Sequence, residues 1–182
     1  MQLKRLIIWP ATLALIVASQ AFAQNAPPPP VRYPCREVHD FDYWVGTFDA
    51  KPWDKPDAPA GGQLHNTREY DGCVFIERFS SPGGSGMSIT FYDITRKTWR
   101  MVWNDDSNGS NVFDEGTYHD GVMRFTGWVV NPKGVRVMAS NVIENAGPDV
   151  IHHTFSVSPD SGKTWIVRGN NRFVRVKSSG NP

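Results

Sequence analysis

No segment of the 182-residue chain shows the apolar stripe of an amphipathic helix over ten residues. Folds that alternate strands with helices, including dinucleotide-binding domains, are therefore excluded. Charge of one sign is also scarce, because the formal net charge is only +1. We therefore expect no nucleic-acid partner, since proteins that grip the phosphate backbone carry a clear excess of positive charge.

Motifs of the common hydrolases and phosphoryl-transfer enzymes are absent as well. The chain has no Gly-x-Ser-x-Gly motif, no glycine-rich phosphate loop and no pair of catalytic carboxylates. The sequence therefore gives no support to nucleophilic hydrolysis or to phosphoryl transfer.

The residues that are present favour strands and turns. With 16 Gly, 14 Pro, 7 Trp and 10 Phe, the chain is rich in turn residues and in aromatic strand formers. From Phe41 onward, apolar and polar residues alternate between regularly spaced turn residues. This pattern predicts about ten strands, near residues 42–50, 63–70, 73–80, 87–93, 97–104, 111–118, 121–130, 134–145, 149–158 and 163–176.

Short turns such as Asp71-Gly72 and Asp120-Gly121 separate these segments, so neighbouring strands should be antiparallel. A series of hairpins must hide its outer edges, and an up-and-down barrel does so by closing the sheet on itself. We therefore predict an all-β fold, an antiparallel up-and-down β-barrel of about ten strands. A two-sheet sandwich is the alternative.

The first 23 residues have the features of a signal peptide. Lys4 and Arg5 precede an apolar run at 6–17, and an Ala-Phe-Ala cleavage site ends at residue 23. The alternative, an uncleaved membrane anchor, needs about 20 apolar residues, more than this run provides. We therefore expect a periplasmic or secreted protein without a membrane anchor after cleavage.

The chain thus divides into four predicted segments. Residues 1–23 are the signal peptide, 24–40 a proline-rich N-terminal segment, 41–177 the barrel and 178–182 a disordered tail. Four consecutive prolines make the second segment a stiff, extended spacer.

Cys35 and Cys73 are the only cysteines of the chain. Export places them in an oxidising compartment, where a disulfide is the default state. The alternative, a reactive or metal-binding thiol pair, lacks a third ligand at a recognisable spacing. We therefore predict a Cys35–Cys73 disulfide that fastens the N-terminal segment to an early strand.

Alternation also predicts which side chains point into the barrel. The expected inward residues are Met87, Ile89, Phe91, Trp99, Met101, Trp103, Ile151, His153, Phe155 and Val157. Another strand presents Phe75, Glu77 and Phe79 on one face but Val74 and Ile76 on the other. Because both of its faces are apolar, the pattern leaves the inward face of that strand undecided.

Three segments together resemble a known family. In chain order they are Phe41-Asp42-Tyr43-Trp44-Val45-Gly46-Thr47-Phe48, Trp99 to Trp103-Asn104-Asp105, and Ser158-Pro159-Asp160-Ser161-Gly162-Lys163-Thr164-Trp165. They resemble a lipocalin-like, calycin-type family of exported bacterial domains of unknown function, which opens with F-D-F-W-x-G-x-W and closes with S-x-D-x-G-x-x-W. The likeness extends over roughly 41–176, and it implies a calycin-type barrel but no reaction.

One loop has the spacing of a calcium-binding loop. Asn104, Asp106 and Asn108 alternate before a glycine, and Glu115 follows six residues after that glycine. The flanking residues alternate as strands do, whereas the known loop joins two helices. We therefore favour the alternative, a polar hairpin connection with an Asn-Gly turn and no metal.

Two titratable residues are candidates for chemistry inside the barrel. An inward Glu77 paired with an inward His153 would suit proton transfer. The simpler interpretation, which we favour, is that Glu77 faces solvent or bridges to an arginine, namely Arg78, Arg100 or Arg168. Three roles stay open for His153: a hydrogen-bonded core residue, a ligand contact, or a proximal haem ligand. No cofactor is otherwise indicated.

Two classes of function remain. In the first, the barrel binds a small apolar ligand in an interior formed by Trp44, Phe91, Trp99, Trp103, His153 and Phe155. In the second, the same barrel is an isomerase or lyase that uses Glu77 and His153. A further interpretation is a structural or interaction domain whose tryptophans fill a solid core. The sequence favours the binding protein.

Overall fold

The computed structural model describes residues 35, 38–107, 109–131 and 133–177. Our predictions for the signal peptide, for most of the proline-rich segment, for Asn108 and for the C-terminal tail fall outside these ranges. The described residues all belong to one structural unit, which spans 34–182. None of the helices in these ranges has the length and apolar character of a transmembrane segment.

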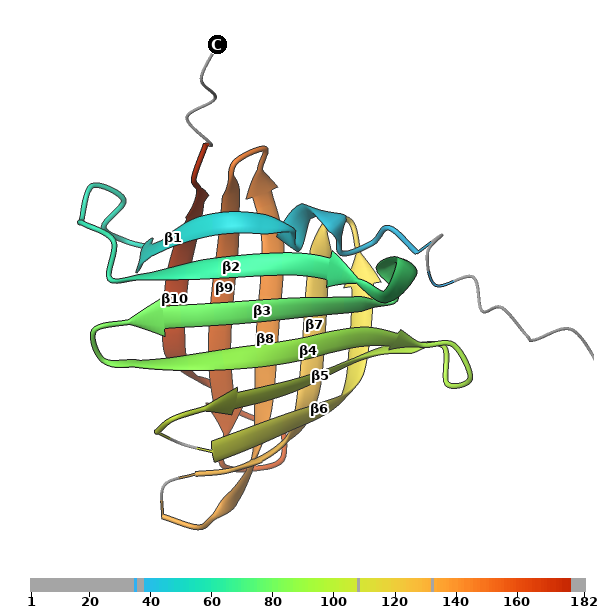
Figure 1. Cartoon of the computed structure of the whole chain (residues 1–182). Helices are drawn as coiled ribbons and strands as arrows, with labels where there is room; N and C mark the ends of the chain where they lie inside the picture. Colours follow the sequence, from blue (N-terminus) through green and yellow to red (C-terminus); the bar gives the residue numbers. More distant parts are fainter. Residues whose placement is uncertain (1–34, 36–37, 108, 132, 178–182) are drawn as a thin grey trace, which may run out of the picture. The chain divides into compact units, whose positions relative to one another are not determined.

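The fold is a closed antiparallel barrel of ten strands (Figure 1), which confirms the predicted up-and-down barrel. Each strand pairs with its neighbours in sequence, and β1 also pairs with β10, which closes the ring. The strands are β1 (Gly46–Pro52), β2 (Gly62–Glu69), β3 (Val74–Ser81), β4 (Gly84–Asp93), β5 (Thr98–Asp105), β6 (Gly109–His119), β7 (Val122–Val130), β8 (Arg136–Gly147), β9 (Val150–Ser158) and β10 (Ile166–Arg175).

The strand predicted at 42–50 begins later than expected. Residues Asp42–Trp44 form the short 3-10 helix η2, and β1 starts only at Gly46. A 3-10 turn places residues three positions apart on the same side, so Phe41 and Trp44 point together into one end of the barrel. A second 3-10 helix, η3 (Tyr70–Gly72), joins β2 to β3.

An aromatic cluster fills the end of the barrel beneath η2, with Phe41 at its centre. The Phe41 ring centroid lies 5.8 Å from that of Trp44, 5.3 Å from Phe75, 5.9 Å from Trp99 and 6.2 Å from Phe125. None of these five side chains is more than 3% exposed. We call them the aromatic plug. Each ring pair contributes roughly 0.5–1.5 kcal/mol beyond the burial of apolar area, so the plug makes this half of the barrel solid.

Arg175, at the end of β10, ties η2 to the barrel wall. Its guanidinium donates hydrogen bonds to the carbonyls of Tyr43 (3.0 Å) and Val45 (2.6 Å) and lies 4.5 Å from the ring centroid of Phe48. Gly46 has a φ of +134°, and a Cβ there would meet the guanidinium at 2.3 Å. Both the backbone conformation and the arginine therefore require glycine at this position.

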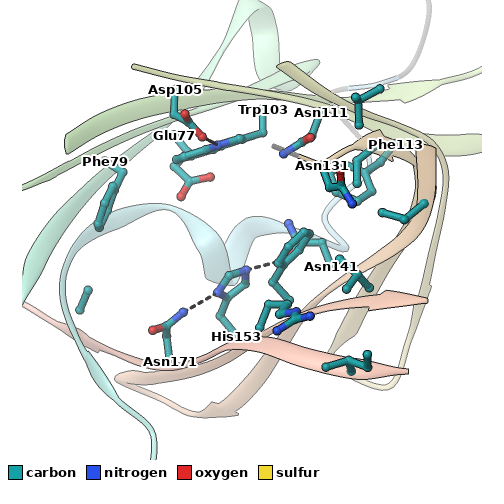
Figure 2. A pocket seen from close by; sticks show the side chains of 18 of the residues that line it. Glu77, Phe79, Trp103, Asp105, Asn111, Phe113, Asn131, Asn141, His153 and Asn171 are labelled. Carbon is teal, nitrogen blue, oxygen red and sulfur yellow. Dashed lines mark hydrogen bonds between the residues drawn. The ribbon is translucent and has the colours of Figure 1, made fainter. Parts of the chain in front are cut away.

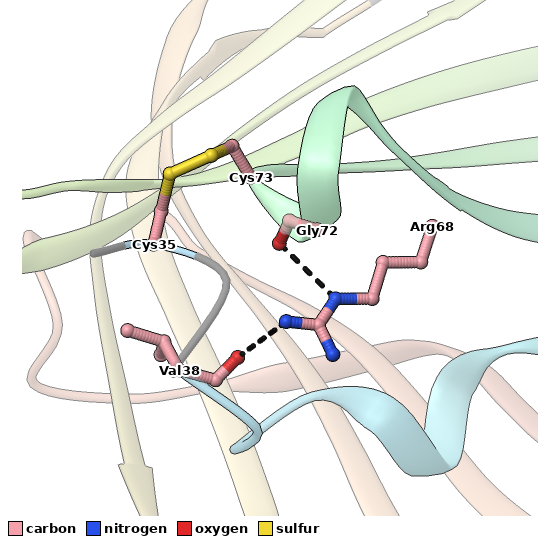
Figure 3. Close-up of a disulfide and its surroundings, with 5 residues drawn as sticks. All are labelled: Cys35, Val38, Arg68, Gly72 and Cys73. Atoms are coloured by element: carbon pink, nitrogen blue, oxygen red, sulfur yellow. Dashed lines mark hydrogen bonds between the residues drawn. A yellow bond between two sulfur atoms is a disulfide. The ribbon is translucent and has the colours of Figure 1, made fainter. Parts of the chain in front are cut away.

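The predicted disulfide is confirmed, since Cys35 is bonded to Cys73 across 38 positions (Figure 3). Close to it, the Arg68 guanidinium donates hydrogen bonds to the carbonyls of Gly72 (3.1 Å) and Val38 (3.2 Å). The disulfide and Arg68 together hold the segment before η2 against the β2–β3 connection.

The inward face that we predicted for β4 is wrong. Ser88 and Thr90 are 1% exposed, whereas Met87 and Ile89 are 38% exposed. The register explains this, because Ser88 lies opposite Glu77 of β3, and directly opposed residues share a face. On the other side, Ser88 lies opposite the large Trp103 of β5, so a small residue fits between the two neighbours and a large one does not.

Phe91 is displaced with the rest of this face. It lies on the outside of the barrel, where the Arg100 guanidinium is 5.7 Å from its ring centroid. The prediction that Phe91 contributes to the interior is therefore wrong.

Replacing Cys35 and Cys73 together by serine should lower the free energy of unfolding by about 4 kcal/mol, because the unfolded chain regains the entropy of a loop of 38 positions. Urea denaturation of the oxidised protein and of the double variant measures the difference. Reduction of the wild-type protein is the matched control and should give the same loss. Unchanged stability in either experiment would contradict a disulfide that holds the fold.

Candidate functional site

The half of the barrel opposite the aromatic plug encloses a cavity of about 770 Å³ (Figure 2). It lies where the odd-numbered strands end, so the β7–β8 and β9–β10 connections contribute to its rim. Its volume is within the range of roughly 300–1,000 Å³ that is typical of small-molecule sites. The solid-core interpretation therefore holds only for the half of the barrel that contains the plug.

Most of the cavity wall is apolar. Aromatic and aliphatic side chains come from seven regions of the ring, namely Ala50, Phe79, Phe113, Val129, Val130, Val137, Phe155, Val157, Pro159, Ile166 and Phe173. Such a surface attracts an apolar molecule because binding removes apolar area from water.

An acidic group stands on the wall formed by β3 to β5. Glu77 points into the cavity, and the Ser88 hydroxyl donates a hydrogen bond to its Oε2 at 2.8 Å. Burial raises the pKa of Glu77 to about 7, and the hydrogen bond from Ser88 offsets part of this rise. Nearby, the Trp103 indole N–H donates to the Asp105 carboxylate at 2.7 Å.

His153 of β9 stands on the opposite wall. Its Nε2 lies 2.6 Å from Asn141 Oδ1, and its Nδ1 lies 3.2 Å from Asn171 Nδ2 (Figure 2). These partners assign the proton to Nε2, because Nδ1 faces an amide donor. Burial lowers the pKa of His153 to about 4, with a smaller contribution from the neighbouring His152. His153 is therefore a neutral side chain with both ring nitrogens hydrogen-bonded.

The structure brings Glu77 and His153 to the same cavity but not into contact. They point into it from facing walls, and in the described part of the chain no hydrogen bond joins them (Figure 2). The interpretation that we favoured, with Glu77 facing solvent or bridged to an arginine, is wrong. The alternation was ambiguous on β3, and only the barrel register places Glu77 on the inner face.

The six predicted ligand-contact residues separate into three groups. Trp103, His153 and Phe155 line the cavity. Trp44 and Trp99 belong to the aromatic plug, where they are 2% and 3% exposed. Phe91 is outside the barrel. Alternation correctly placed Trp99 inside but gave no information on which end of the barrel it occupies.

Sequence reasoning missed the amides of the cavity. Asn111, Asn141 and Asn171 line it, and two of them hold the His153 ring. Their positions carry a signal that we did not use, because Asn141 and Asn171 alternate in phase with the buried Ile143 and Phe173. An asparagine at an inward position of a strand needs a hydrogen-bonding partner inside the barrel.

The histidine pair is split between the two faces of the sheet, as adjacency on a strand predicts. His152 points outward and stacks on Trp53 with ring centroids 3.8 Å apart. Over the described ranges, no group of three or more His, Cys, Asp or Glu residues is placed to hold a metal ion. A haem iron at His153 would have to displace Asn141 or Asn171 from the ring.

The calcium-like spacing lies in the β5–β6 hairpin, and its flanks are strands as we expected. The Asp106 carboxylate accepts hydrogen bonds from the Ser85 backbone N–H (2.8 Å) and hydroxyl (3.0 Å). Asn104 pairs with Ser110 within the hairpin, and Glu115 is exposed on β6. Asn108 is outside the described residues, so the fourth position of the spacing is undescribed.

Comparison with known proteins identifies no relative for this chain. No protein-family model matches it, and no curated protein matches it significantly.

Glu77 and His153 contribute to stability with opposite dependence on pH. The pKa of Glu77 rises from 4.5 to about 7 on folding, so the free energy of unfolding falls as pH increases between these values. The pKa of His153 falls from 6.5 to about 4, so its contribution increases with pH over that range. Between about pH 4.5 and 6.5 the two contributions offset each other.

Relative to the wild-type protein, Glu77→Gln should gain stability as pH increases from about 4.5 to 7, by up to about 1.4 kcal/mol per pH unit. His153→Gln should lose stability relative to the wild type as pH increases from about 4 to 6.5. Urea denaturation at half-unit pH intervals measures both differences. Three parallel curves would show that neither group changes its pKa on folding.

Proposed function

We propose that the protein is an exported, lipocalin-like barrel that binds a small apolar or aromatic molecule in its cavity. The observation that carries the proposal is the apolar cavity of about 770 Å³ in the half of the barrel without the plug. An unfilled interior costs packing energy, which the plug half of the same barrel avoids. A barrel that keeps this void gains from it when a ligand fills the space.

The rim of the cavity supports this proposal. Val130 and Ile166 line the cavity and are also exposed, and the neighbouring Val135, Trp165 and Val167 are exposed as well. These side chains lie on β7, β10 and the adjoining connections. An apolar molecule would therefore meet an apolar surface before it enters.

Export is supported by two features of different kinds. The first is the signal-peptide pattern of residues 1–23. The second is the Cys35–Cys73 disulfide, which persists in oxidising compartments. We therefore propose a periplasmic or secreted location, consistent with the resemblance to exported lipocalin-like domains.

A second candidate function is proton transfer on an aromatic substrate by an isomerase or lyase. It rests on the pKa of Glu77, which at about 7 suits a general acid or base at neutral pH. Native mass spectrometry of protein purified from its natural source would identify a bound molecule. If that molecule is turned over, Glu77→Gln should abolish turnover and keep binding, whereas loss of both would indicate a binding role only.

Uptake of the fluorescent apolar probe N-phenyl-1-naphthylamine tests the binding function. Val157→Trp should reduce the affinity for the probe at least ~tenfold, because the larger side chain occupies the cavity that Val157 lines. The matched control is Val167→Trp, which places the same side chain at an exposed position of β10. It should leave uptake unchanged.

Absence of uptake by the wild-type protein would overturn the proposal, as would equal uptake by the two variants. Circular dichroism and the melting temperature establish that both variants are folded.

A further inference from the structure

Glu77 has fewer hydrogen-bond donors around it than a buried carboxylate needs. An ionised carboxylate accepts about four hydrogen bonds, and Ser88 supplies one of them. Within the described ranges, no lysine or arginine forms an ion pair with Glu77, although it stands deep on the inner wall. The cavity therefore leaves most of this acceptor capacity open to whatever occupies it.

A second acceptor without a donor lies beside Glu77. Asn66 of β2 is the direct cross-strand neighbour of Glu77 and is 2% exposed. Its Nδ2 donates to the Trp44 carbonyl at 2.9 Å, whereas its Oδ1 has no hydrogen-bond partner. Directly opposed residues of antiparallel strands have Cβ atoms about 5 Å apart. The two acceptors thus form one electron-rich patch, and a group with several N–H donors complements it.

The other charged or titratable residues of the cavity leave this patch as the place for a cation. They are Asp105, His153, Lys133 and Arg168, while β2, β4 and β6 face Glu77 with Asn66, Ser88 and Asn111. Asp105 already accepts from the Trp103 indole, and His153 is neutral. Lys133 and Arg168 are exposed to solvent, so they need no partner inside the cavity.

We propose that the ligand is a small apolar amine, whose ammonium group binds Glu77 while its hydrocarbon or aromatic body packs against Phe79, Phe113 and Phe155. This inference rests on the proposed binding function and specifies its ligand class. An ammonium carries three N–H donors, which match the open acceptor sites of Glu77 and of Asn66. Because the cavity excludes water around the carboxyl group, the ion pair there is stronger than one at the surface.

Binding of such an amine releases a proton at acidic pH. Below its pKa of about 7, Glu77 is neutral, so the arriving ammonium displaces the carboxyl proton to solvent and the carboxylate remains as its partner. Affinity should therefore increase about tenfold per pH unit below pH 7 and level off above it. His153 titrates near 4 and stays neutral across this range.

Isothermal titration of the mature chain with three matched probes tests the proposal at pH 7.5. Tryptamine, tryptophol and indole-3-propionate share one ring system and carry an ammonium, a hydroxyl and a carboxylate. Tryptamine should bind at least ~tenfold more tightly than tryptophol, and indole-3-propionate should bind most weakly. Glu77→Gln should abolish the preference for tryptamine but keep the binding of tryptophol. Glu115→Gln removes the same charge from the exposed face of β6 and should change nothing.

Tryptophol or indole-3-propionate binding as tightly as tryptamine would overturn the amine proposal, and so would a Glu77→Gln variant that keeps the preference. Failure of all three probes with continued uptake of N-phenyl-1-naphthylamine would also overturn it, but would leave the general binding function intact. If Glu77→Gln does not fold, the wild-type protein decides the question. Its affinity for tryptamine must increase from pH 5 to 6.5 with release of about one proton, and a flat profile would refute the proposal.

Discussion

The structure depends on how the side chains of one closed ring share a single interior. Pairing of β1 with β10 removes both sheet edges, and it also sets a width that inward side chains must fill or leave empty. At one end, Phe41 and Trp44 enter from η2, outside the sheet, and complete the packing of Phe75, Trp99 and Phe125. At the other end the described chain supplies no such element, and the cavity is the result.

Desolvation in this interior acts on Glu77 and His153 in opposite directions and favours the uncharged form of each. The protein satisfies the two groups unequally. His153 has an amide on each ring nitrogen, whereas Glu77 has the Ser88 hydroxyl alone, beside the unpartnered carbonyl oxygen of Asn66. The wall around His153 is thus preorganised and complete, and the wall around Glu77 is the one on which a ligand has hydrogen bonds to gain.

Much of the barrel could be predicted from the alternation of residues, because a strand with one face in a core repeats with period two. The inward faces of β5 and β9 followed in this way, and both agree with the structure. On β3 and β4, apolar residues occupy the outward face as well, so period two alone does not say which face is inside. There, the cross-strand register decides, since Ser88 must share the face of Glu77 and Trp103.

The sequence by itself determined the class of fold, the approximate strands and the disulfide, because turn chemistry, periodicity and cysteine count are local or compositional properties. Only the tertiary structure decided which inward residues lie in the plug and which line the cavity. Trp99 and Trp103 are four positions apart on one face of β5, yet one is sealed in the aromatic plug and the other borders the open space. Their difference arises from the position of η2 and from the closure of the ring, which bring together residues far apart in the chain.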